Sequence, residues 1–212
     1  MWQQLHDELS PLGLTIIAVA LDADEAAVRE WATQQPFTMP IVIDRNFVVA
    51  DAYGIVNVPA TVWIDEQRRI VRPASTAMGD DRFRAFTDID SAVHHDLLRR
   101  WVRDGVRDLD DEGVRDLQPA PTDEIQRARL HRQVAIALRD RGDIDGSRHH
   151  LDAAEALAPW DWTISRGNMP LRGEDPFGSR FFEFAANYAA AGRPGDFPLQ
   201  TGKNRPPGSE NS

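Results

Sequence analysis

The chain has no cysteine among its 212 residues. This absence excludes disulfide bonds, thiolate metal sites and catalysis by a thiol belonging to these residues. It does not indicate the redox compartment, because a chain without cysteine is compatible with both an oxidising and a reducing environment.

An excess of positive charge and long apolar runs are also missing. The formal net charge of −10 and the pI near 5.0 argue against a nucleic-acid partner, which requires a concentrated basic face. Lys203 is the only lysine among 24 lysine and arginine residues. No apolar run approaches the ~20 residues needed to span a bilayer, and residues 1–4 lack the basic and apolar regions of a signal peptide. We therefore expect no membrane span, and a cytoplasmic location.

The first half of the chain alternates between strand and helix patterns. The run from Leu14 to Leu21 is almost continuously apolar, which is typical of a strand covered on both faces. Further strands are predicted at 40–43, 60–64 and 69–72, and the polar residues 65–68 predict a hairpin turn between the last two. Helical spacing of apolar residues predicts helices at 2–9, after a capping box at 22–25, at 48–53 and through 93–102. This order indicates an α/β fold.

The second half has a helical pattern. Residues 107–122 are acidic, carry two prolines and predict a linker. Helices are predicted at 123–141 and 145–157, with the small and apolar residues of one tetratricopeptide (TPR) type repeat. A last helix carries Phe181, Phe184, Ala185 and Tyr188 on one face. The predicted organisation is a first domain at 1–106, the linker, an all-α TPR-like domain at 123–191 and a disordered tail at 192–212.

Four ordered segments of the first domain carry a resemblance to a known family. They are Leu14–Asp22, Ile43–Asp44, Ala52–Ile55 and Val56–Asp65. Together they resemble the thioredoxin-fold redoxins of the TlpA/ResA and alkyl-hydroperoxide-reductase type. The resemblance implies a thioredoxin-like fold over roughly the first half of the chain, and an ancestral activity in thiol–disulfide exchange or peroxide reduction on a protein or peptide substrate.

The same resemblance implies a substrate-binding loop at Val58, Pro59, Ala60 and Thr61. In such redoxins a cis proline precedes a strand, and here this residue is Pro59. The preceding residue, Val58, is then expected to offer its backbone N–H and C=O to an extended substrate. The residues alone leave a second interpretation open, in which Pro59 only begins an inward strand.

The resemblance also shows what the chain lacks. Complete family members begin with a central strand that leads into a Cys-containing motif at the start of the first helix, where the helix end lowers the thiol pKa. This chain starts inside that helix, so no catalytic residue is assigned and two strands are left without the partner between them. Three explanations stay open: a start recorded too late, with a Cys or selenocysteine motif and any export signal or anchor lost; a non-catalytic relative that binds a peptide or protein partner through the cis-proline groove and the helical repeat; or a fragment without function.

Other constellations predict neither a cofactor nor a metal site. His94–His95 and His149–His150 are adjacent pairs that point to different sides of a helix, so they are expected to be solvated. His131 is expected to approach the second pair across the helical hairpin. An aromatic set favours the core of a small domain over a partner surface, although a protein partner at the helical domain stays open; it comprises Trp160, Trp162, Phe177, Phe181, Phe182 and Phe184.

Overall fold

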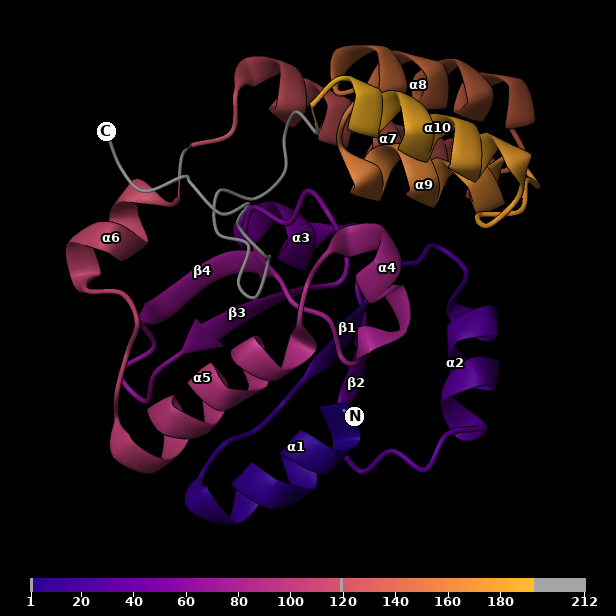
Figure 1. Ribbon diagram of the computed structural model, residues 1–212. Coiled ribbons are helices and arrows are strands. Elements are labelled where there is room, and N and C mark those ends of the chain that lie inside the picture. The colour runs from indigo at the N-terminus through magenta and orange to yellow at the C-terminus, as the bar shows by residue number, and fades with distance from the viewer. Residues whose placement is uncertain (1, 119, 193–212) are drawn as a thin grey trace.

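The computed structural model describes residues 2–118 and 120–192 (Figure 1). Its four strands form two separate two-stranded sheets. Strand β1 (Ala18–Ala20) pairs in parallel with β2 (Ile41–Ile43), and β3 (Ala60–Ile64) pairs antiparallel with β4 (Ile70–Thr76). Among the described residues no strand ladder joins the two sheets. The mixed α/β class predicted from the sequence is confirmed.

Helices surround and extend this pair of sheets. Six of the α-helices in the described part of the chain, α2 and α5 to α9, are preceded by an Asp or Thr N-cap. The side chain of each N-cap accepts a hydrogen bond from a backbone N–H of the first turn that would otherwise be unpaired. None of the helices in the described part of the chain is long and apolar enough to cross a membrane. The helical elements are α1 (Trp2–Leu9), η1 (Ser10–Leu12), α2 (Glu25–Thr33), α3 (Val48–Ala52), η2 (Asp81–Phe83), α4 (Arg84–Thr87), α5 (Ser91–Asp104), α6 (Asp111–Asp116), α7 (Asp123–Asp140), α8 (Ile144–Leu157), α9 (Trp162–Leu171) and α10 (Ser179–Ala190).

Strand β1 is shorter than the predicted strand at 14–21. The Leu14 N–H donates to the Leu9 carbonyl at 3.3 Å, and the Ile16 N–H donates to Nδ1 of His6 at 3.4 Å. The backbone of residues 14–16 is thus bonded to helix α1 instead of to a strand. The prediction of a strand covered on both faces is wrong, since each of residues 14–21 is either half-buried or exposed and none of them is buried. The strand is also shorter than predicted, because its partner β2 is itself only three residues long.

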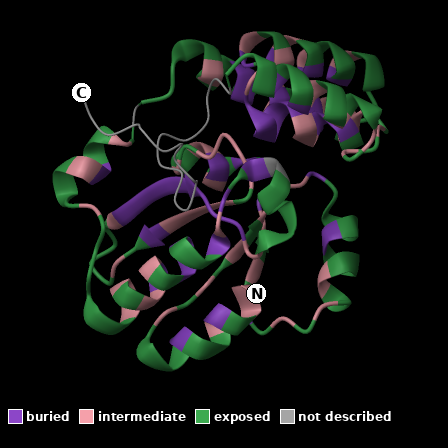
Figure 2. Cartoon of the chain, in the orientation of Figure 1, coloured by how far each residue is buried: buried purple, intermediate pink, exposed green. Residues whose placement is uncertain are grey.

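Strand β4 is longer than the predicted strand at 69–72 and continues through Pro73 to Thr76. Proline has no N–H for a ladder, and the β3–β4 register shifts between Thr61 and Trp63, opposite this proline. The shift allows the strand to continue past Pro73. Figure 2 shows β4 buried along most of its length, and its polar residues Arg72, Ser75 and Thr76 are buried too.

A hydrophobic core lies between the β3–β4 hairpin and helices α1 and α5, which run in front of the strands in Figure 1. The rings of Trp63 and Trp101 stack there at 5.2 Å between centroids. The guanidinium of Arg72 lies 5.1 Å from the Trp63 ring centroid and pairs with Asp108. Leu5, Leu9, Val71 and Leu98 complete the buried cluster.

The stretch predicted as a linker contains helix α6 and contacts the sheet. Val114 of α6 is buried, and α6 lies against β4. The ion pair of Asp108 with Arg72 joins the preceding loop to the same strand. The segment therefore contacts the first part of the chain through α6 and Asp108, while most of its described residues are exposed.

The second half is helical, as predicted, with α7 and α8 as an antiparallel hairpin and α10 near its predicted position. Helix α9 was not predicted, because Gly167 and Pro170 interrupt its pattern. The aromatic set forms a core in part: Trp160, Trp162, Phe181 and Phe184 pack with Tyr188, whereas Phe177 and Phe182 are exposed. The predicted disordered tail lies outside the described residues except for Gly192.

Helix α7 is packed against the first half of the chain. Ile136 is buried in a cluster with Ala23, Phe47 and Ala50, which come from the α2 and α3 region. At the end of α7, Arg45 and Asp140 form an ion pair at 2.5 Å. The helical part is therefore anchored on α3 through both apolar and charged contacts.

We expect Ile136→Ala to lower the free energy of unfolding by about 2–5 kcal/mol, because the removed methylenes leave a cavity between α7 and α3. Chemical denaturation followed by circular dichroism measures this loss. The matched control is Leu130→Ala on the same helix, whose side chain is 60% exposed and should change stability little. Equal effects of the two substitutions would contradict the packing described.

Candidate functional site

The predicted loop Val58–Thr61 leads into strand β3. The Val58–Pro59 peptide bond is cis, in agreement with the prediction. Pro59 is exposed and Val58 half-buried, so this end of the loop is open to solvent. Ala60 and Thr61 pair with Thr76 and Ser75 of β4. The four residues thus form a short segment, accessible at its start and held by the hairpin at its end.

The side chain of Asn57 is hydrogen-bonded to the Val58 N–H, which is a backbone group that a substrate was expected to use. Its side-chain oxygen accepts the Val58 N–H at 2.8 Å. An extended chain that pairs with Val58 would have to displace this contact. Sequence reasoning did not single out Asn57, and only its position beside the loop could have pointed to it.

His94 lies between this loop and the first helix. Its Nε2 is 3.4 Å from the Thr61 hydroxyl, and its ring packs edge-on against Trp2 at 5.9 Å and Trp63 at 5.3 Å between centroids. The neighbouring His95 also contacts Trp2, and its Nε2 is 3.1 Å from the Met78 carbonyl oxygen. A single imidazole thus contacts the first turn of α1 and the second residue of β3.

The prediction that His94 and His95 are solvated is wrong, since both are buried. Adjacent helix positions do point in different directions. Here, however, the ring of Trp2 and the segment around Met78 cover the second direction. Helical spacing alone could not reveal these covering groups, because they come from distant parts of the chain.

Burial keeps His94 neutral. Its removal from water, together with the nearby Arg72 guanidinium, lowers the pKa of His94 from 6.5 to about 3. Burial also lowers the pKa of His95. The neutral imidazole can accept the Thr61 hydroxyl proton in a hydrogen bond, so it serves to orient this residue and is poorly suited to hold a positive charge.

The structure offers no metal centre in the part of the chain it describes, where no three His, Asp or Glu side chains are placed to hold one ion. His131 does approach the second histidine pair, as predicted: its Nδ1 is 2.8 Å from Nδ1 of His150. At this distance one ring donates and the other accepts.

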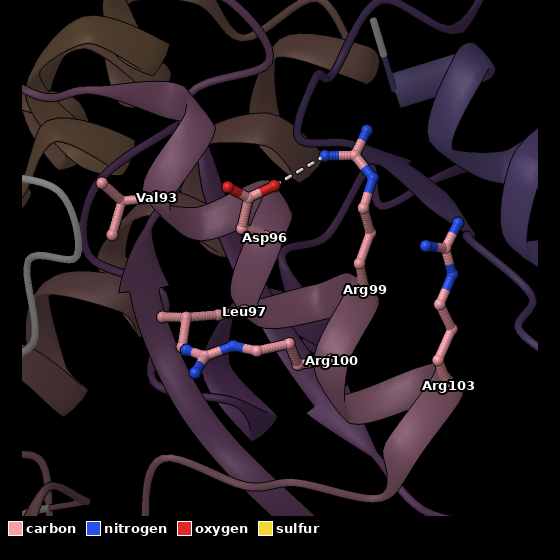
Figure 3. Close-up of a pocket in the computed structure, with 6 residues that line it drawn as sticks. All are labelled: Val93, Asp96, Leu97, Arg99, Arg100 and Arg103. Atoms are coloured by element: carbon pink, nitrogen blue, oxygen red, sulfur yellow. Dashed lines mark hydrogen bonds and ion pairs between the residues drawn. The ribbon is translucent and has the colours of Figure 1, made fainter.

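A shallow pocket on helix α5 is separate from the loop (Figure 3). Arg99 donates to Asp96 at 3.0 Å, as the dashed line in Figure 3 shows, and also to Glu8 of α1 at 3.0 Å. Arg103 donates to the same Glu8 at 2.6 Å. The hydrogen bond from Arg99 and the positive charges of both arginines lower the pKa of Glu8. The arginines therefore connect α5 to α1 and provide no contact to the Val58–Thr61 loop.

Comparison with known proteins places the similarity in the first part of the chain. Residues 1–72 match the AhpC/TSA family. The thiol-disulfide oxidoreductase ResA of Halalkalibacterium halodurans is 32% identical over 87 residues, which cover 41% of this chain and 49% of that protein. The protein of the same name from Oceanobacillus iheyensis is 31% identical over 84 residues, which cover 40% of this chain and 44% of that protein.

The chain therefore matches about half the length of these curated relatives. No solved structure showed significant similarity to the chain.

The low pKa of His94 predicts a pH-dependent stability. The folded-state pKa lies below the unfolded value, so between pH 6.5 and about 3 the unfolded chain binds the extra proton. The contribution of neutral His94 to the free energy of unfolding is therefore complete above pH 6.5. It is lost as the pH falls, at up to about 1.4 kcal/mol per pH unit. We expect His94→Phe to reduce the slope of unfolding free energy against pH between 6 and 4.5.

Urea titrations at several pH values measure this slope. The matched control is His149→Phe at an exposed histidine, which should leave the slope as it is. An unchanged slope in His94→Phe would contradict the assignment of a neutral, buried His94.

Proposed function

Because its first part is a thioredoxin-like redoxin segment of the TlpA/ResA type, we propose that this chain supplies the polypeptide-binding part of a thiol–disulfide oxidoreductase. Its Val58–Thr61 loop binds an extended polypeptide next to a disulfide. The reacting sulfur or selenium atom belongs to a residue outside these 212, since none of them is cysteine.

The observation that carries the proposal is the shared contact of His94. The Thr61 hydroxyl lies 3.4 Å from one side of this buried ring, and Trp2 in the first turn of α1 packs against it. The start of α1 and the start of β3 are thereby held at one place. A nucleophile located near the start of α1 would face a polypeptide bound along Val58, which is the arrangement that disulfide exchange requires.

The two separate sheets support a strand between β1 and β3 in the complete catalytic unit. The apolar residues Ile17, Val19 and Ile64 are exposed at 55%, 36% and 42%, although they lie in or beside the strands. Apolar strand residues are normally covered, and unpaired strand edges favour addition of a further strand. An inserted strand would provide backbone partners for both edges and would lead into the start of α1.

The alternative is a non-catalytic protein that binds a polypeptide through the same loop. The absence of cysteine favours it, because such a function needs no thiol. Both functions share the binding step and differ only in chemistry, so one experiment on binding and one on reactivity separate them.

If the loop binds a polypeptide, we expect Asn57→Ala to bind a peptide more tightly than the unsubstituted chain. The substitution frees the Val58 N–H from its 2.8 Å contact, and loss of a competing hydrogen bond of about 1 kcal/mol corresponds to about 5-fold tighter binding. Amide chemical-shift changes on titration with a short peptide cyclised by one disulfide measure the affinity. We expect these changes at Val58, Ala60 and Thr61. Perturbations confined to other segments would exclude this loop as the binding site.

The chemical step is tested by a gain of activity. We expect the 212-residue chain to show no reduction of insulin disulfides. A chimera that carries the strand and Cys-containing segment of the Halalkalibacterium halodurans relative ahead of α1 should reduce them. The control chimera has those cysteines replaced by serine. A folded chimera no more active than this control would reject the catalytic proposal and leave the non-catalytic binding function.

A further inference from the structure

The helical part of the chain contacts the backbone just ahead of the Val58–Thr61 loop. The Trp162 N–H, in the first residue of α9, donates to the Val56 carbonyl oxygen at 2.9 Å. The Arg129 guanidinium, on α7, donates to the Ile55 carbonyl oxygen at 3.4 Å. Two successive carbonyl groups, two and three residues before Val58, are thus bonded to two helices of the second half.

Arg129 connects this segment to two buried or half-buried carboxylates. Its Nε is 3.1 Å from Oδ1 of Asp51 on α3 and 4.0 Å from Oδ2 of Asp161. The Arg129 side chain is 8% exposed and that of Asp161 is 4% exposed. The planar guanidinium has donors in several directions, which lets it contact α3, the Ile55 carbonyl and the start of α9 together.

Asp161 fixes the beginning of α9 and with it the Trp162 contact. Its Oδ1 accepts the backbone N–H groups of Thr163 and Ile164 at 2.9 and 3.3 Å, and the Thr163 hydroxyl at 2.5 Å. Burial raises the pKa of Asp161, and the Arg129 cation opposes that rise. Burial likewise raises the pKa of Asp51, and the Arg129 cation opposes this rise too. Arg129 therefore stabilises both carboxylates that hold the helices against the segment.

We infer that Arg129 is a positioning residue for the polypeptide-binding loop, and that α7 and the first turn of α9 set the backbone conformation of residues 55–58. The inference rests on the proposed function, because it gives the helical part a role in orienting the Val58 backbone. It assigns to this part of the chain a function in substrate binding that does not depend on a partner of its own.

Three variants of the full chain test the inference. Arg129→Lys keeps a cation beside Asp51 but has a single ammonium that cannot also reach the Ile55 carbonyl in the same geometry. Arg129→Met removes the cation. Arg45→Gln is the matched control. It removes the exposed ion pair with Asp140, which also joins the first half of the chain to α7, and the ion pair does not involve residues 55–58.

We expect Arg129→Lys to weaken binding of the disulfide-cyclised peptide by about 5-fold and to increase amide hydrogen exchange at residues 55–58. Its Tm should stay within a few degrees of that of the unsubstituted chain. Arg129→Met should weaken binding at least as much, with a lower Tm, because it leaves two carboxylates without their cation. Arg45→Gln should change neither exchange nor affinity.

A purely structural role gives a different pattern. In that case Arg129→Lys has the same peptide affinity and the same amide hydrogen exchange at residues 55–58 as the unsubstituted chain, and the inference is overturned. Exchange at 55–58 that rises as much in Arg45→Gln would overturn it as well. If the unsubstituted chain does not bind the peptide, the proposed function fails, and the exchange measurement by itself decides whether Arg129 positions the segment.

Discussion

The arrangement of this protein depends on the burial of two α7 arginines, Arg129 and Arg132, where α7 meets α3. A buried cation is costly unless carboxylates and carbonyl groups surround it. Arg129 has Asp51 and Asp161. Arg132 donates to the Gly167 carbonyl and lies over the Phe47 ring, and burial lowers its pKa to about 9. The partners of both arginines come from both halves of the chain, so the halves must meet in one specific way.

That constraint extends to the loop that the proposed function uses. The same α7–α9 surface that surrounds Arg129 donates to the carbonyl groups of Ile55 and Val56. On the other side, His94 contacts Thr61 and Trp2. The loop is therefore held from two directions, by the helical part before the proline and by α5 after it. Pro59 itself stays exposed, which leaves the middle of the loop accessible to a polypeptide.

In the proposed function, the reacting group and the binding surface come from different residues, and only the binding surface lies within this chain. The match to the AhpC/TSA family covers residues 1–72, which contain the loop, whereas no residue of the chain is a cysteine. The two two-stranded sheets and the exposed apolar residues at their strands agree with a catalytic unit that includes a further strand. The helical part lies outside the residues matched by the AhpC/TSA family and donates hydrogen bonds to the Ile55 and Val56 carbonyl groups just ahead of the loop.

The sequence by itself determined the α/β class, most helices and the loop at Val58–Thr61, because these depend on local periodicity, on capping residues and on an ordered set of short motifs. Tertiary structure decided the rest. It extended β4 through Pro73, where a register shift between Thr61 and Trp63 of β3 accommodates a residue without an N–H. It buried His94 and Arg129, whose partners are far away along the chain, and a spacing rule contains no information about such partners. Burial of a polar side chain is set by what covers it, and here the covering residues come from other elements.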